Sequence, residues 1–148
     1  MARIIHRDDS QARALLDGVG VRIHPVADTG DADPDVIASV LPEGVRHVRA
    51  EADIEVPDGV DAGMGAWHVN AVDELHVVCS GEGVMEFITL DGVVGVLVEA
   101  GDVIEIRGAE HRYRPLTRQR WRLRYGGSPE GDLVATETGR VHQPWTSA

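Results

Sequence analysis

The second half of the chain alternates short apolar segments with turn residues. From about Arg46 onward, segments rich in Val, Ile and Leu are interrupted about every eight to twelve residues by Gly, Asp or Pro. Examples are ELHVVCS, VMEFITLDG, VVGVLVEAG and DVIEIRG. Short strands at this spacing predict an antiparallel sandwich or barrel. No segment is long and amphipathic enough to be a crossover helix, which disfavours an α/β fold.

The residues before this region follow a different pattern. The segment QARALLDG predicts a short helix that Asp9 or Ser10 caps and that Gly18 or Gly20 ends. A second helix is expected at DPDVIASVLPEG, because proline suits the first turn of a helix and Pro-Glu-Gly ends one. The expected organisation is a single domain with three parts, namely a helical lead-in at 1–45, a β-barrel at 46–127 and an irregular polar tail at 128–148.

Composition narrows the classes of partner and the compartment. The 148 residues carry a formal net charge of −11, which disfavours binding to nucleic acid or to anionic membranes. The one cysteine, Cys79, cannot form an intramolecular disulfide. The N-terminal segment lacks the apolar stretch of a signal peptide. We therefore expect a cytoplasmic protein without membrane or nucleic-acid partners.

The segment WHVNAVDELH, residues 67–76, concentrates the candidate chemistry. Residues two apart on a strand share a face, so His68 lies with Asn70, and Glu74 lies with His76. A turn at NAVD is expected to pair the two strands and bring all four side chains to one side of a sheet. Two hairpins further on, His111 follows a Gly-Ala turn and can return beside them. Two imidazoles and one carboxylate form a set that binds Fe(II), Ni(II), Mn(II) or Zn(II).

These residues resemble a known family. The stretch from Trp67 to Gly83, followed by GDVIEIRGAEH ending at His111, is similar to the two cupin motifs, and most closely to the acireductone dioxygenase branch. The resemblance runs from roughly Pro34 to Gly127. It implies an all-β double-stranded β-helix (a cupin jelly-roll barrel) with one or two short N-terminal helices. It also implies one divalent transition metal, with Fe(II) favoured, a small-molecule substrate, O₂ as co-substrate, and a homodimer.

Carried over by motif position, the resemblance assigns metal binding to His68, Glu74 and His111. Asn70 stands where the family has a second histidine, and His76 stands where it has an arginine. Two interpretations remain open. In the first, His76 supplies the missing imidazole and restores three histidines and one glutamate. In the second, which we favour, His68, Glu74 and His111 form a three-ligand site. Asn70 then supports a ligand or hydrogen-bonds the substrate, and His76 is a fourth ligand or a general base. The lost arginine also makes a substrate other than acireductone a reasonable expectation.

Further residues are candidates for the substrate pocket. Trp67, Phe87 and Tyr113 are expected in its wall, with ordinary core packing as the alternative for each. Arg122 or Arg124 would hold an anionic substrate if either faced inward; the alternative is a solvated strand face. The leading functional hypothesis is a mononuclear metal-dependent dioxygenase for a small enediol or dicarbonyl. A metal-dependent isomerase or lyase without O₂ chemistry and a non-catalytic ligand-binding cupin are the alternatives.

Overall fold

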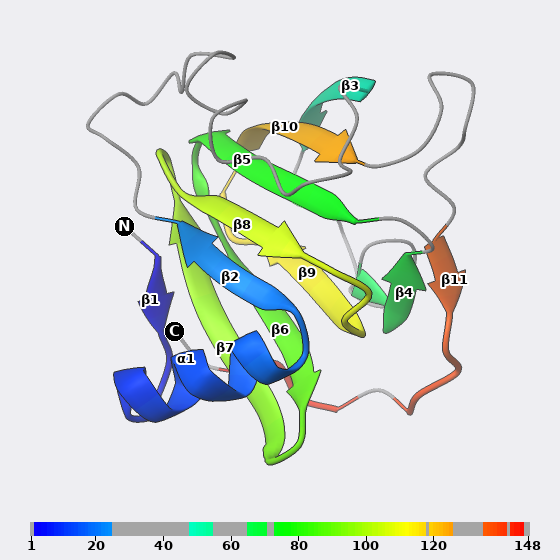
Figure 1. The fold of residues 1–148 in the computed structure, drawn as a ribbon. Helices are drawn as coiled ribbons and strands as arrows, with labels where there is room; N and C mark the ends of the chain where they lie inside the picture. The colour runs from blue at the N-terminus through cyan, green and yellow to red at the C-terminus, as the bar shows by residue number, and fades with distance from the viewer. Residues whose placement is uncertain are drawn as a thin grey trace.

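Two antiparallel sheets pack against each other and form the body of the molecule (Figure 1). The structure is a computed structural model, and it describes residues 2–24, 48–54, 65–70, 73–117, 119–125, 135–141 and 143–146. The expectation of an all-β antiparallel architecture is confirmed. The short apolar segments of the second half supply most of the strands.

Within the described residues, the first sheet has six strands, and it contains elements from both ends of the chain. Its order is β1 (Arg3–Ile4), β7 (Gly92–Glu99), β6 (Glu82–Thr89), β9 (His111–Pro115), β4 (His68–Asn70) and β11 (Ala135–Glu137). The second sheet has five strands in the part of the chain that the structure describes. Their order is β2 (Val21–His24), β8 (Val103–Ile106), β5 (Glu74–Ser80), β10 (Gln119–Tyr125) and β3 (Val48–Ile54). Strands β1 and β2 arise from the predicted lead-in, and β11 arises from the predicted tail.

The core lies between the sheets and follows the two-residue period of the strands. From β6, Met85 and Phe87 face inward, opposite Val96 and Val94 of β7. The second sheet contributes the buried isoleucines Ile104 and Ile106 of β8. Burying these aliphatic and aromatic side chains supplies most of the driving force for the fold, at about 25 cal/mol per Å² of apolar surface. The candidate ligands His68, Glu74 and His111 are the first residues of β4, β5 and β9.

One helix, α1 (Asp9–Gly18), packs its apolar side onto the body beside β2 and β6. Figure 1 shows it crossing one end of the sheets. The predicted cap is off by one residue, because the carboxylate of Asp8 accepts the backbone N–H of Gln11 at 3.0 Å. The helix ends before Gly20, whose φ of 84° favours glycine. The second predicted helix, at DPDVIASVLPEG, lies outside the described residues.

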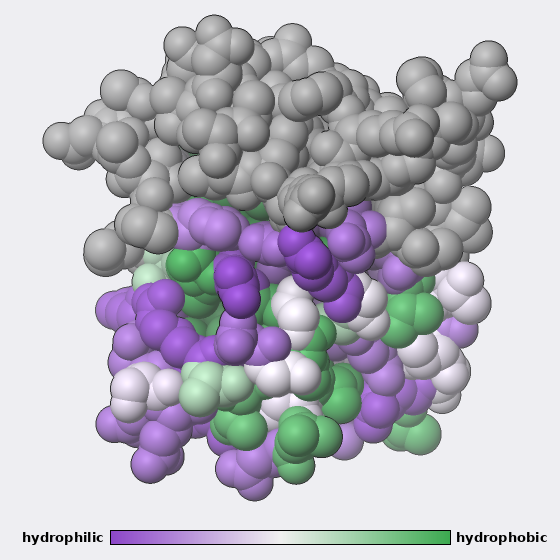
Figure 2. All heavy atoms as spheres, viewed as in Figure 1, coloured by the Kyte–Doolittle hydropathy of each residue, from purple (hydrophilic) through white to green (hydrophobic). Residues whose placement is uncertain are grey.

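The surface of the described region is mixed in character. Figure 2 shows hydrophilic and hydrophobic residues interspersed over the part of this face that the structure describes. Among the described residues, no helix combines the length and the apolar character needed to cross a membrane.

Candidate metal centre

Three strands from the two sheets bring the candidate ligands together in the interior. His68 of β4 is the register partner of His111 of β9 in the first sheet. Glu74 and His76 of β5 lie opposite Ile106 and Ile104 of β8 in the second sheet. Directly opposed residues share a face of a sheet, and both isoleucines belong to the core. Glu74 and His76 therefore point inward, toward the first sheet.

The prediction of a hairpin between the His68 strand and the Glu74 strand is wrong. Strand β4 pairs with β9 and β11, whereas β5 pairs with β8 and β10. The connection between Asn70 and Glu74 therefore passes from one sheet to the other. The candidate residues face each other across the interior instead of lying side by side on one sheet.

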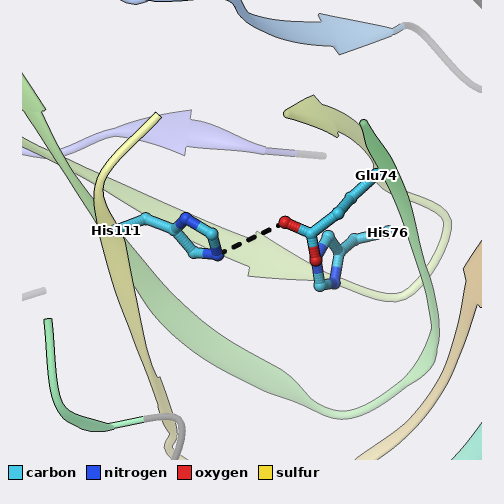
Figure 3. Close-up of side chains that lie close together, drawn as sticks. All are labelled: Glu74, His76 and His111. Atoms are coloured by element: carbon cyan, nitrogen blue, oxygen red, sulfur yellow. Dashed lines mark hydrogen bonds and ion pairs between the residues drawn. The ribbon is translucent and has the colours of Figure 1, made fainter. Parts of the chain in front are cut away.

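Glu74, His76 and His111 form the tightest group. One potential ligand atom from each lies within 4.8 Å of the others. Figure 3 shows the imidazole of His111 approaching from β9 while Glu74 and His76 extend from β5. Glu74 Oε2 lies 3.7 Å from His111 Nε2, and Glu74 Oε1 lies 3.1 Å from His76 Nε2. The carboxylate thus lies between the two imidazoles.

His68 lies beside this group on the His111 side. The ring centroids of His68 and His111 are 4.4 Å apart, with the planes inclined by 57°. Both rings are anchored in the same way: Nδ1 of His68 donates to the Ala66 carbonyl at 2.7 Å, and Nδ1 of His111 donates to the Ala109 carbonyl at 2.8 Å. A carbonyl only accepts, so Nδ1 carries the proton in each ring. In the neutral form Nε2 then holds the lone pair that a metal needs.

Asn70 reaches Glu74 from the opposite sheet. Its Nδ2 donates to Glu74 Oε2 at 2.6 Å. Asn70 is only 8% exposed, and its Oδ1 has no hydrogen-bond partner among the described residues. A buried carbonyl oxygen without a partner loses its hydration and receives nothing in return. The amide therefore presents an acceptor that a ligand could satisfy.

The electrostatics of the site favour an ionised carboxylate beside a neutral imidazole. Burial raises the pKa of Glu74, but the charge and hydrogen bond of His76 and the contributions of His111 and Asn70 outweigh it, so the pKa lies below its ordinary value. Burial lowers the pKa of His111 to about 4, against a smaller opposing contribution of Glu74. At neutral pH this arrangement offers an anionic oxygen and an uncharged imidazole nitrogen, which are the protonation states that bind a divalent cation.

The predicted pocket residues fall in different places. Phe87 is fully buried and lies 5.9 Å from His111 between ring centroids, so it forms part of the wall of the site. The ring of Trp67 instead stacks on Arg112, on the face of the sheet away from His111. Tyr113 packs against the core with its hydroxyl next to Gly83. Arg122 and Arg124 belong to β10, and their side chains lie outside the described part of the chain.

Sequence reasoning missed a second polar cluster, which backs the site from the other face of the first sheet. Arg112 and Glu86 are each 1% exposed, and Arg112 Nε donates to Glu86 Oε1 at 2.6 Å. The guanidinium lies between the rings of Trp67 and Trp145, at 4.6 Å and 3.9 Å from their centroids. The available signal was a lone glutamate inside the apolar run VMEFIT.

Comparison with known proteins finds a likeness in structure alone. No model of a known family matches the chain, and no curated protein matches its sequence. The structure is similar to that of an acireductone dioxygenase from Bacillus anthracis with a cadmium ion in its active centre. The TM-score is 0.58 and the identity 17%, over 91% of this chain and 96% of that one. The chain therefore has the cupin fold, as its motifs predict.

Proposed function

We propose that this chain is a metal-dependent cupin enzyme, an oxygenase of the acireductone dioxygenase type that acts on a small enediol or dicarbonyl. The observation that carries the proposal is the buried convergence of Glu74, His76 and His111. The cupin fold, shared with a dioxygenase that holds a metal in its active centre, supports the same class of activity.

The residues present fit a divalent transition metal. Glu74 is 2% exposed, and its partners among the described residues are imidazoles and an amide. A buried carboxylate in such surroundings is best compensated by a cation. Backbone carbonyls fix the Nδ1 protons of His68 and His111, which leaves the lone pair of Nε2 in each ring available to a metal. Mixed imidazole and carboxylate donors suit Fe(II), which we favour, and also Ni(II), Mn(II) or Zn(II).

We assign the ion to Glu74, His76, His111 and His68. The closeness of His76 to Glu74 supports His76 as the ligand that replaces the imidazole missing at position 70. We therefore favour His76 as a metal ligand over His76 as a general base. When bound, a divalent ion supplies Lewis acidity to the oxygens of a substrate.

The other side chains bind and orient the substrate. Asn70 Oδ1, buried and without a partner among the described residues, can accept the O–H of an enediol. Phe87 covers the His111 side and excludes water from it. Arg122 and Arg124 stay candidates for holding an anionic group of the substrate.

Metal analysis tests the proposal first. Purified protein, reconstituted with Fe(II) under anaerobic conditions and desalted, is expected to retain close to stoichiometric metal. His111→Asn keeps a donor for the Ala109 carbonyl but lacks Nε2, and it should retain far less. The matched control is His6→Asn, an exposed histidine with φ of 53°, a conformation that asparagine tolerates. Only trace metal in the wild type, with no gain on reconstitution, would refute the proposal.

O₂ consumption then separates the oxygenase from the alternatives. The Fe(II) protein is mixed with an acireductone or a 1,2-dicarbonyl, with and without O₂. Consumption of O₂ together with substrate supports the oxygenase. Substrate conversion at equal rates without O₂ would show an isomerase or lyase, and binding without conversion would show a ligand-binding cupin.

A further inference from the structure

The C-terminal residues 143–146, here termed the C-terminal clasp, dock on the first sheet behind the candidate metal centre. Arg112 Nη2 donates to the carbonyl of Gln143 at 2.9 Å, and the ring of Trp145 covers the guanidinium at 3.9 Å. Thr146 donates its backbone N–H to Glu86 Oε2 at 3.1 Å and its hydroxyl to the same oxygen. The clasp thus contacts both members of the buried ion pair.

This pair is better suited to fixing a position than to adding stability. Removing two charges from water costs about as much as their attraction returns, so an apolar pair of equal volume is often no less stable. The pair of Arg112 and Glu86 is held by directional contacts, and its guanidinium lies between the rings of Trp67 and Trp145. Planar stacking and forked hydrogen bonds define where an arginine lies.

The pair of Arg112 and Glu86 lies directly behind His68 and His111. Arg112 follows His111 in β9, and Trp67 precedes His68 in β4. Within the described residues, β4 and β9 form a single register pair, His68 with His111. Neighbours along a strand point to opposite faces. The contact between β4 and β9 therefore carries the two imidazoles on its inner face and the Trp67–Arg112 stack on its outer face.

Other C-terminal residues hold the same two strands. Thr138 donates its backbone N–H to the Trp67 carbonyl at 3.0 Å, and Glu137 of β11 is the register partner of His68. Arg140 forms a bidentate ion pair with Glu110, next to His111, with contacts of 2.6 and 2.9 Å. Strand β4 is only three residues long, so much of its placement depends on these partners.

We propose that the C-terminal clasp is a positioning device for the metal centre. It sets the separation of His68 and His111 through the Trp67–Arg112 stack, and Trp145 and Arg112 are its positioning residues. The inference rests on the proposed metal site. Its consequence is that loss of the clasp weakens metal binding more than a general loss of stability would.

Cobalt(II) binding to full-length variants tests the device. Trp145→Ala opens one side of the stack, and Arg112→Lys keeps the charge for Glu86 but loses the planar fork. Each should raise the Kd for Co(II) by about tenfold or more, the range found when groups that support a ligand are removed. Each should also shift the visible d–d bands, which report the geometry of the ligands. Val141→Ala, at an exposed position before the clasp, should change neither readout.

A second control separates positioning from stability. Leu16→Ala in α1 removes a buried side chain from a helix that contributes no candidate ligand, so it lowers Tm. The Kd and the d–d bands of this variant should equal those of the wild type. Equal changes in Leu16→Ala and Trp145→Ala would overturn the inference, because the effect would then follow stability alone.

The linkage can also be measured in the reverse direction. If the clasp favours metal binding, bound Co(II) must favour the docked clasp by the same factor. Amide hydrogen exchange at 143–146 should therefore slow on addition of Co(II). A wild type that binds no Co(II) overturns the proposed function and this inference together. Tight binding by the wild type with unchanged Kd and spectrum in both clasp variants overturns the inference alone.

Discussion

Acid should destabilise the metal-free protein through His111. This side chain is buried and neutral, and burial lowers its pKa from 6.5 to about 4. In the unfolded chain the imidazole returns to its ordinary pKa of about 6.5. Between these values the unfolded state binds a proton that the folded state does not bind. Stability that is present above pH 6.5 is therefore lost as the pH falls toward the folded pKa.

The size of the loss follows from the two pKa values. They are 6.5 and about 4, and each pKa unit corresponds to about 1.4 kcal/mol, which limits the loss to about 3 kcal/mol. Glu74 acts in a lower window. Its pKa is depressed in the folded state from 4.5, so its contribution is present above that value and disappears as the pH falls through the folded pKa. Of these two groups, His111 therefore dominates the loss between neutral pH and about pH 5.

Urea unfolding measured across pH in the presence of EDTA isolates this contribution. Wild type and His6→Asn should lose unfolding free energy together on acidification. His111→Asn keeps a donor for the Ala109 carbonyl but cannot titrate, so its free energy should fall less over the same range. Absolute stability differs between the variants, and the readout is the slope with pH. Parallel curves for wild type and His111→Asn would refute the burial of a neutral imidazole as the cause.

Three further perturbations test the polar clusters and the packing. Glu86→Leu should cost about 3–5 kcal/mol in urea unfolding, because it leaves a buried guanidinium unpaired, and the double variant with Arg112→Met should recover most of that loss; additive costs would contradict the pairing. Asn70→His alone should weaken Co(II) binding, measured by titration, because it removes a hydrogen bond to Glu74. Adding His76→Arg to this variant should restore binding. Equal Co(II) affinities of the single and the double variant would contradict this coupling between the two positions. Gly83→Ala should lower stability by about 1–3 kcal/mol, because a Cβ there would overlap the tyrosine hydroxyl opposite, and an unchanged Tm would contradict that packing.

The sequence predicts the architecture because the relevant signal is local. Alternating apolar residues between glycine and aspartate turns describe strands such as β6 and β7, and their pairing as a hairpin follows from the short turn between them. The cap at Asp8 was missed by one residue, since neighbouring aspartates and a serine are chemically equivalent caps. Local patterns thus identify the elements and leave their ends uncertain by a residue.

Pairing across the site could not be predicted in the same way. Parity along WHVNAVDELH orders the side chains on each strand, but it does not say whether the connection between Asn70 and Glu74 returns along one sheet or passes to the other. The choice depends on β9 and β11, which pair with β4 from distant parts of the chain. The buried pair of Arg112 and Glu86 was also missed, because charged residues on a strand are usually exposed to solvent.

The two departures from the cupin motif act on the same carboxylate. Asn70 donates to Glu74 Oε2 from the first sheet, and His76 contacts Glu74 Oε1 from the same strand as the glutamate. Relative to the cupin motif that the chain resembles, position 70 carries an amide in place of an imidazole, and position 76 carries an imidazole in place of an arginine. The Asn70 amide orients the Glu74 carboxylate, and its own Oδ1 has no hydrogen-bond partner among the described residues. Glu74 therefore lies among imidazole donors and beside a neutral acceptor at position 70. Under the proposed function, this arrangement favours a substrate that offers hydroxyl groups.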